Sequence, residues 1–186
     1  MFKSIYELIS SQDENRIALE SSTGIKLSYK NLRKKVDNVV KLLQYLKLEN
    51  ERIAIILPNG LGAAFAFLSV SSSAVSAPLN PNFKKKEFEF YLIDLKIKAI
   101  LIEQNSQSPV VDVAKALGLK IIELCSPNTN PNLIVSKINR DEPCLSEEDR
   151  KSLDRKVDLA LLLHTSGTTG KPKIVPLTQG NLCASV

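Results

Sequence analysis

The segment Arg52-Ile-Ala-Ile-Ile-Leu57, with Pro58-Asn59-Gly60 and the apolar run Leu61 to Ser71 behind it, decides the fold of this 186-residue chain. Isoleucines dominate its first part, which predicts a buried strand that Pro58 ends. The Asn59-Gly60 turn then leads into an apolar helix. A strand, a turn and a helix in this order form the repeating unit of a parallel sheet with helices packed on it.

The same unit recurs towards the C-terminus. We expect a helix from Glu87 to Leu95, a strand from Lys98 to Ile102, a helix from Pro109 to Leu117 and a strand from Lys120 to Leu124. Before the first unit, residues 17–27 predict a hairpin, and Ser28 is expected to cap a helix that ends near Lys47. The polar stretch from Cys125 to Lys156 predicts a surface excursion with one short helix. Together these features predict an α/β fold with a mostly parallel sheet and flanking helices.

Composition and charge exclude several classes of protein. The apolar fraction of 44% and the charged fraction of 24% are those of an ordinary globular chain. The net charge of +5 comes from 25 basic residues scattered among 20 acidic ones, so no nucleic-acid partner is expected. The compact basic run Lys84 to Lys86 is followed by Glu87, which is typical of a solvated first helical turn. No apolar run reaches the roughly 18 residues of a membrane span.

The cysteines and the N-terminus indicate a cytoplasmic protein. Cys125, Cys144 and Cys183 are odd in number and widely spaced, which fits neither a disulfide framework nor a metal-binding pair. Residues 1–16 lack the continuous apolar core of a signal peptide. We therefore expect a reducing, cytoplasmic environment and no metal site of the zinc type.

One loop carries the chemistry of the sequence. The apolar strand Asp158 to His164 runs straight into Thr165-Ser-Gly-Thr-Thr-Gly-Lys-Pro-Lys173, and a β-type run from Ile174 to Leu177 follows. Two glycines allow backbone amides to approach a ligand, while hydroxyl groups and two lysines supply donors and positive charge. A polyphosphate would satisfy these donors at once. The predicted binding residues are Thr165, Ser166, Gly167, Thr168, Thr169, Gly170, Lys171, Pro172 and Lys173.

Two other interpretations of this loop are less consistent with its sequence. A Walker A loop has four residues between its glycines and a Ser or Thr after its lysine, and a helix begins there. Here two residues separate Gly167 from Gly170, Pro172 follows Lys171, and a β-type run comes next. A plain surface turn rich in Ser, Thr and Gly is the other interpretation. The order of the residues and the flanking strands disfavour it.

The loop resembles, almost letter for letter, the signature of the AMP-forming acyl-CoA synthetases, which are grouped with firefly luciferase and the peptide-synthetase adenylation domains. Leu57-Pro-Asn59, Ala77-Pro-Leu-Asn-Pro81 and Glu87-Phe-Glu-Phe-Tyr-Leu92 also look like the N-terminal region of that family. With His164 and Pro176-Leu-Thr-Gln-Gly-Asn-Leu182, the chain is most similar to the oxalate-CoA ligase branch. Ile174 departs from the family, where glycine is common, and Gln179 stands where histidine is frequent.

The resemblance implies a reaction in two steps. A carboxylate attacks the α-phosphorus of ATP to give an acyl-adenylate and pyrophosphate, and coenzyme A, the co-substrate of the full-length enzyme, then takes the acyl group. By this analogy the hydroxyl groups and Lys173 of the loop would hold the β- and γ-phosphates beside Mg²⁺. Lys171 is a weaker candidate. Sequence alone leaves open whether His164 is a packed residue or a functional one.

The family's later motifs for adenine, ribose and Mg²⁺, its hinge and its C-terminal catalytic lysine lie beyond the loop. We therefore expect residues 1–186 to be the N-terminal portion of an adenylation domain, an incomplete subdomain without the C-terminal part and lid, inactive alone and with no catalytic residue to assign. The alternative is a non-catalytic phosphate-binding or docking module that needs a complementary C-terminal fragment. A third interpretation is a peptide-synthetase adenylation domain. The acyl substrate, whether oxalate or a fatty or aromatic acid, cannot be predicted from these residues, because the resemblance implies that its pocket is built largely from residues after the loop.

Overall fold

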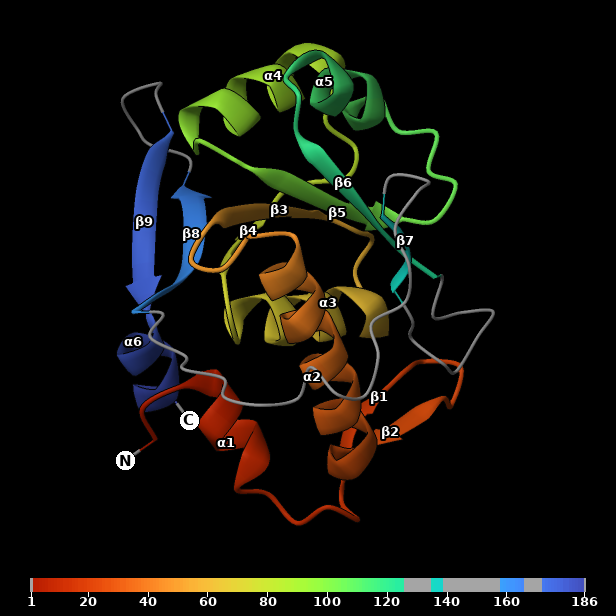
Figure 1. The fold of residues 1–186 in the computed structure, drawn as a ribbon, viewed down its shortest axis with the longest axis vertical. Coiled ribbons are helices and arrows are strands. Elements are labelled where there is room, and N and C mark those ends of the chain that lie inside the picture. The colour runs from red at the N-terminus through yellow and green to blue at the C-terminus, as the bar shows by residue number, and fades with distance from the viewer. Residues whose placement is uncertain (1, 126–134, 139–157, 166–171, 186) are drawn as a thin grey trace.

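The computed structural model describes residues 2–125, 135–138, 158–165 and 172–185 of the chain. Within these residues seven strands form one sheet in the order β7-β6-β5-β3-β4-β8-β9, and two more form a separate hairpin (Figure 1). The strands are β1 (Ile17–Glu20), β2 (Lys26–Ser28), β3 (Arg52–Ile56), β4 (Val75–Pro78), β5 (Ala99–Glu103), β6 (Lys120–Leu124), β7 (Val135–Ile138), β8 (Leu159–Thr165) and β9 (Lys173–Thr178). The helices are α1 (Ile5–Ser10), α2 (Tyr29–Tyr45), α3 (Leu61–Ser71), α4 (Lys85–Asp94), α5 (Val110–Ala116) and α6 (Gln179–Ala184).

The direction of the strands confirms the predicted parallel sheet. β3 pairs in parallel with β4 and β5, β5 pairs in parallel with β6, and β4 pairs in parallel with β8. β7 and β9 run antiparallel to their neighbours at the two outer positions of the described sheet. Pro176 lies in β9, at an outer position of the described sheet, where proline is tolerated. The sheet is therefore parallel in its interior and antiparallel at its margins.

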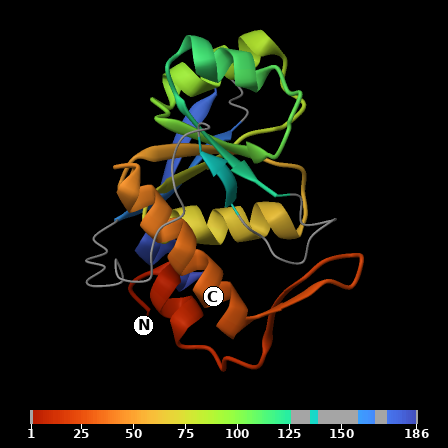
Figure 2. The ribbon, with the colours of Figure 1, turned by 45° about the vertical axis from the view of Figure 1, so that its right-hand side comes forward.

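Helices cover both faces of the sheet, which explains why its central strands are continuously apolar. α1, α2, α3 and α6 lie on one face, and α4 and α5 lie on the other (Figure 1). Successive residues of β3 alternate between the two cores: Ile53 and Ile55 pack with α2 and α3, whereas Ala54 and Ile56 pack with α4 and α5. Figure 2 shows the same layers from another side, with α1 and α6 beside each other, so that the two ends of the described chain meet.

The turn between β3 and α3 depends on Gly60. This residue is the N-cap of α3 and has φ of +149°, a backbone conformation that residues with a Cβ atom rarely adopt. Apart from Gly60 itself and its two chain neighbours, no atom lies within 4 Å of the place where a Cβ would stand, so space is not the constraint. The Asn59-Gly60 pair therefore provides the turn because of its backbone freedom, as the sequence predicts.

Gly60→Ala is expected to lower the free energy of unfolding by about 1–3 kcal/mol, because alanine is strained at this φ angle. Urea denaturation followed by circular dichroism measures the change. Gly180→Ala is the matched control, since its Cβ would make an ordinary contact at 3.6 Å with Oγ1 of Thr178. That control is expected to leave stability unchanged or to raise it by up to about 1 kcal/mol. Equal destabilisation by both variants would contradict the assignment to backbone strain.

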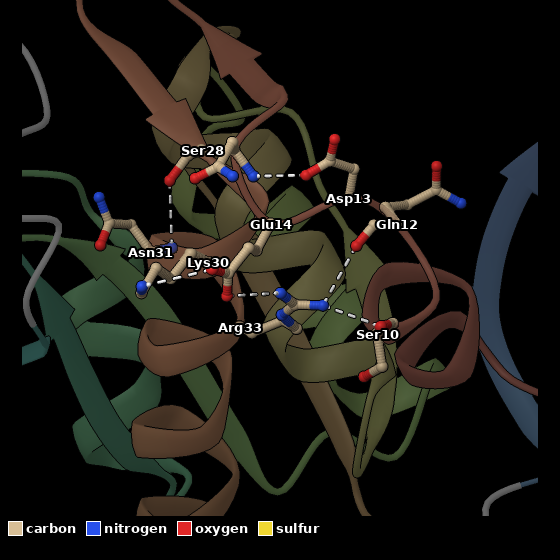
Figure 3. Close-up of polar contacts among 9 residues, drawn as sticks. Ser10, Gln12, Asp13, Glu14, Ser28, Lys30, Asn31 and Arg33 are labelled. Carbon is tan, nitrogen blue, oxygen red and sulfur yellow. Dashed lines mark hydrogen bonds and ion pairs between the residues drawn. The ribbon is translucent and has the colours of Figure 1, made fainter.

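Arg33 of α2 binds the segment that joins α1 to β1 and so attaches it to α2 (Figure 3). Its Nη1 donates to the carbonyl oxygens of Ser10 at 2.8 Å and Gln12 at 3.3 Å. Its Nη2 lies 3.9 Å from Oε2 of Glu14, and Nζ of Lys30 lies 3.5 Å from Oε1 of the same carboxylate. The two ion pairs are largely exposed and contribute little. The guanidinium bonds to backbone oxygens hold the end of α1 and the segment after it against α2.

Among the described elements that precede β8, three are absent from the sequence-based expectations. The four-residue β4 contains Ser76 and Pro78 and has no strand-like periodicity, yet it is fixed by parallel pairing with β3. α1 is a short helix that is capped by the side chain of Ser4. β7 lies in the stretch where the sequence predicts an excursion with one short helix, and it gains its structure by pairing with β6. The predicted short helix itself falls on no described residue.

Candidate functional site

The predicted phosphate loop joins β8 to β9, and the two strands bring its ends together. They pair antiparallel up to the register partners Thr165 and Lys173, and Oγ1 of Thr165 makes a long hydrogen bond of 3.5 Å to the carbonyl oxygen of Lys173. Both side chains are exposed, and Pro172 beside them is half-buried. Ser166 to Lys171 lie outside the described residues. Of the nine predicted binding residues, the structure therefore places Thr165, Pro172 and Lys173, at the base of the loop.

Lys173 supplies a positive charge at this base. Among the described residues no carboxylate forms an ion pair with its ammonium group, and its side chain faces solvent. The hydroxyl of Thr165 can donate to an anionic oxygen from the opposite arm. A cation and a hydroxyl group at adjacent strand ends are suited to binding a phosphate or another multivalent anion.

The side chain of His164 is packed and hydrogen-bonded. Sequence alone left open whether this residue is packed, and the structure shows that it is. Its side chain is 8% exposed, and its Nε2 lies 3.0 Å from Oδ2 of Asp94 at the end of α4. The imidazole also meets the ring of Tyr91 edge-on, with centroids 4.8 Å apart. Tyr91 in turn stacks on Phe83 at 4.8 Å. The residue directly before the loop is thus held against α4.

Buried hydroxyl groups attach the start of β8 to the rest of the sheet. β8 shares one ladder pair with β4, Ser76 with Leu161. The hydroxyl of Ser76 donates to the carbonyl oxygen of Ala160 at 2.9 Å, and the hydroxyl of Ser71 donates to that of Ser76 at 2.9 Å. These serines are fully buried. Their hydrogen bonds add to the short ladder between β4 and β8. The only sequence signal for them is a run of serines inside an apolar stretch.

Gln179 connects the loop-bearing hairpin to α1 and α3. This side chain is 4% exposed; its Oε1 accepts from the backbone N–H of Ile5 at 3.0 Å, and its Nε2 donates to the carbonyl oxygen of Ser71 at 2.6 Å. Its backbone N–H donates to the carbonyl oxygen of Asp158 at 2.7 Å. The amide therefore uses both a donor and an acceptor at a position where the family often has histidine, and its role here is structural.

A shallow pocket lies elsewhere, at the carboxyl ends of β3, β5 and β6. Residues 57–63, Glu103 and Leu124 line it. The lining contains one carboxylate and no cationic side chain, so this pocket is not suited to a polyphosphate. Its residues do not include Thr165 or Lys173. The loop base is formed by other strands, β8 and β9.

The remaining reactive groups among the described residues do not form a second site. No group of three His, Cys, Asp or Glu side chains in this part of the chain could hold a metal ion. Burial raises the pKa of the Cys183 thiol, and the nearby Glu7 raises it further. That thiol therefore stays protonated near neutral pH, unlike a nucleophilic cysteine. Within the described residues no helix has the length and hydropathy needed to cross a membrane.

Comparison with known proteins agrees with the predicted family. The family described as AMP-binding enzyme matches residues 8–186. The chain is 36% identical over 155 residues to the oxalate–CoA ligase of Saccharomyces cerevisiae, covering 73% of this chain and 28% of that protein. It is 35% identical over 135 residues to the oxalate–CoA ligase of Arabidopsis thaliana, covering 72% of this chain and 26% of the relative. The chain thus spans about a quarter of the length of these relatives.

Comparison with solved structures also finds the fold of an adenylate-forming enzyme. The crystal structure of ATP-bound MatB from Rhodopseudomonas palustris superimposes with a TM-score of 0.73 at 21% identity, over the whole of this chain and 36% of that one. At this level of identity the likeness concerns the fold alone. The expected resemblance to adenylate-forming enzymes, and to oxalate–CoA ligases among them, is confirmed.

Proposed function

Since the chain belongs to the AMP-binding enzyme family, we propose that it is part of an enzyme that activates a carboxylic acid with ATP and transfers the acyl group to coenzyme A. The observation that supports this proposal is the base of the loop, where the exposed side chains of Thr165 and Lys173 lie on paired strand ends. We further propose that residues 1–186 are the N-terminal portion of the adenylation domain, and that other segments supply the remaining groups.

The proposed reaction has two group transfers. A carboxylate oxygen bonds to the α-phosphorus of ATP while the bond from that phosphorus to the bridging oxygen breaks, so that pyrophosphate leaves. The sulfur of coenzyme A then bonds to the acyl carbon, and AMP leaves. The loop residues Thr165 to Lys173 would hold the β- and γ-phosphates. Negative charge grows on the departing pyrophosphate, and a positioned ammonium group stabilises it more in the transition state than in bound ATP.

The described part of the loop fits a magnesium-bound polyphosphate. The hydroxyl of Thr165 is an oxygen ligand of the kind that Mg²⁺ prefers, and Lys173 is free to meet phosphate oxygens that the ion leaves uncovered. Mg²⁺ would neutralise charge on the phosphates and orient them. The protein's own contribution at this place is to position one hydroxyl and one ammonium group.

Oxalate is the acyl substrate that we propose first. Two relatives that match at 36% and 35% identity are named oxalate–CoA ligases. Another relative, at 27% identity, is named a malonate–CoA ligase, which is also specific for a small dicarboxylate by name. A fatty or aromatic acid is the alternative substrate class. The lining of the pocket described above includes neither Thr165 nor Lys173, so the assay must compare these acids directly.

The test is MgATP binding and ATP–pyrophosphate exchange by the purified chain, with oxalate, malonate and a panel of fatty and aromatic acids. We expect saturable binding of MgATP in calorimetry, competed by pyrophosphate, and no exchange without further segments. Absence of binding to a folded chain would contradict the role assigned to the loop. Exchange with oxalate would show that residues 1–186 suffice, and it would overturn the proposal that other segments are required.

A docking module is the second candidate. Ile174 is 40% exposed on β9, and no described strand pairs with the outer edge of β9. An exposed apolar side chain on an unpaired strand favours a covering partner, for which we propose a complementary C-terminal fragment. Adding a separately produced fragment that carries the later motifs distinguishes the candidates. Restored exchange would support assembly of an enzyme from two chains, whereas tight association without exchange would favour the non-catalytic module.

A further inference from the structure

The contact between His164 and α4 contains a polar group that packing alone does not explain. A carboxylate only accepts hydrogen bonds, so Nε2 of His164 carries the proton in its 3.0 Å bond to Asp94. In the neutral ring Nδ1 is then an acceptor, and it is buried without a partner among the described residues. A phenylalanine would make the same edge contact with Tyr91 and bury no unpaired nitrogen. The histidine thus breaks a packing rule, which is typical of functional positions.

The bond joins a rigid helix end to the base of the loop. Asp94 is the last residue of α4, and α4 is anchored by the fully buried Phe88 and Leu92. His164 directly precedes Thr165, and its register partner on β9 is Ile174, which directly follows Lys173. Both arms of the loop therefore begin one residue from this bond.

Few other contacts can set the direction of the hairpin at this point. The single ladder pair between β8 and β4 lies at Leu161, three residues before His164. Beyond that pair, Leu162 is 3% exposed and packs in the core with α4 and α5, whereas Leu163 is 36% exposed. The bond from Asp94 to His164 is thus the described polar contact that ties the far end of β8 to the body of the domain.

We propose that Asp94 and His164 form a positioning pair, which fixes the end of β8 against α4 and so aims Thr165 and Lys173 at a polyphosphate. The inference deepens the proposed function and rests on it. Neither residue touches the nucleotide in this proposal. Their role is to hold the two side chains that do, as supporting hydrogen bonds do in preorganised sites.

The chain itself offers a specific probe, because His164 is its single histidine. Long-range ¹⁵N–¹H correlation of the imidazole is expected to show the tautomer with the proton on Nε2. In the nucleotide-free chain, His164→Phe and Asp94→Ala are expected to shift the amide signals of Thr165 and Lys173 in the same direction. Glu89→Ala is the control, since it removes another exposed carboxylate of α4 that has no bond to β8. Unchanged amide signals in the first two variants would overturn the proposal whether or not the chain binds nucleotide.

Binding supplies the second readout. His164→Phe and Asp94→Ala are each expected to weaken MgATP binding about threefold to tenfold, and the double variant should lose no more than either single one. His164→Gln, whose amide N–H can replace the Nε2–H donor, should recover most of the affinity. Wild-type affinity in His164→Phe, or losses that multiply in the double variant, would show that the pair has only a structural role.

The two proposals fail in different ways. If the unaltered chain binds no MgATP while the amide signals still shift, the nucleotide role of the loop is wrong and the positioning of the strand ends by Asp94 and His164 stands. If MgATP binds equally in all variants, the loop keeps its role and the positioning pair is wrong. Glu89→Ala must match the unaltered chain in both measurements.

Discussion

Lys173→Ala is expected to lower the affinity of the chain for MgATP about tenfold to hundredfold, because it removes a charge-assisted hydrogen bond to phosphate. The ammonium group belongs to the first residue of β9, and it is exposed and has no ion-pair partner among the described residues. Its removal therefore leaves no described carboxylate unpaired. Calorimetric titration with MgATP measures the change. Stability should hardly differ, since an exposed side chain is removed.

The control for this prediction is Lys26→Ala. Lys26 is an exposed lysine in the N-terminal hairpin, 3.4 Å from Glu20, and its loss changes the net charge by the same amount. A general electrostatic effect would weaken binding in both variants alike. If Lys173→Ala binds MgATP as tightly as the unaltered chain, the assignment of the loop base to phosphate is wrong. In the intact enzyme, unchanged pyrophosphate release by this variant would lead to the same conclusion.

Gln179→Ala is expected to lower the free energy of unfolding by about 2–5 kcal/mol. The substitution leaves the N–H of Ile5 and the carbonyl oxygen of Ser71 buried without their partners, and it opens a small cavity between α1, α3 and α6. Urea denaturation followed by circular dichroism measures the loss. Because the side chain joins both ends of the described chain, the transition should move as a whole and stay cooperative.

Gln107→Ala provides the comparison for this loss. Gln107 is exposed after β5, and its amide bonds only locally, to the carbonyl oxygen of Asn105 at 3.3 Å, so its replacement should change stability by less than about 0.5 kcal/mol. A similarly small effect at Gln179 would mean that water replaces both hydrogen bonds. The structural role assigned to this residue would then be wrong.

The elements that sequence predicted well are those whose residues face two cores. β3 and β5 are buried on both faces, and β6 is buried on one face and half-buried on the other, so their apolar runs stand out against the polar turns around them. β4 could not be found in this way, because Val75-Ser-Ala-Pro78 has small and polar residues and becomes a strand only through its partner β3. Pairing between distant residues leaves little trace in the local sequence.

The candidate site shows the same difference between features of the local sequence and contacts between distant residues. The loop was recognisable because its hydroxyl groups, glycines and lysines are contiguous from Thr165 to Lys173. The contact of His164 with Asp94 was not, because the two residues are far apart in the chain and are joined only by the fold. Gln179 is a similar case, since its partners Ile5 and Ser71 come from two other helices. Local chemistry is readable from sequence, whereas the contacts that position it are not.

The short ladder between β4 and β8 has a consequence for the order of folding. β3 and β4 are neighbouring strands joined through α3, and β5 and β6 are neighbouring strands joined through α5, so the contacts within each pair close short loops. β8 must instead find β4 across α4, β5, α5, β6 and β7, and it gains only the pair of Ser76 with Leu161 in that ladder. Closing a long chain segment for few contacts is slow. Such pairing is favoured when the strand that β8 pairs with is already in place. We therefore expect the strands that carry the loop to join late, onto a sheet that has already formed, so that the proposed nucleotide-binding end is the last part to acquire its shape.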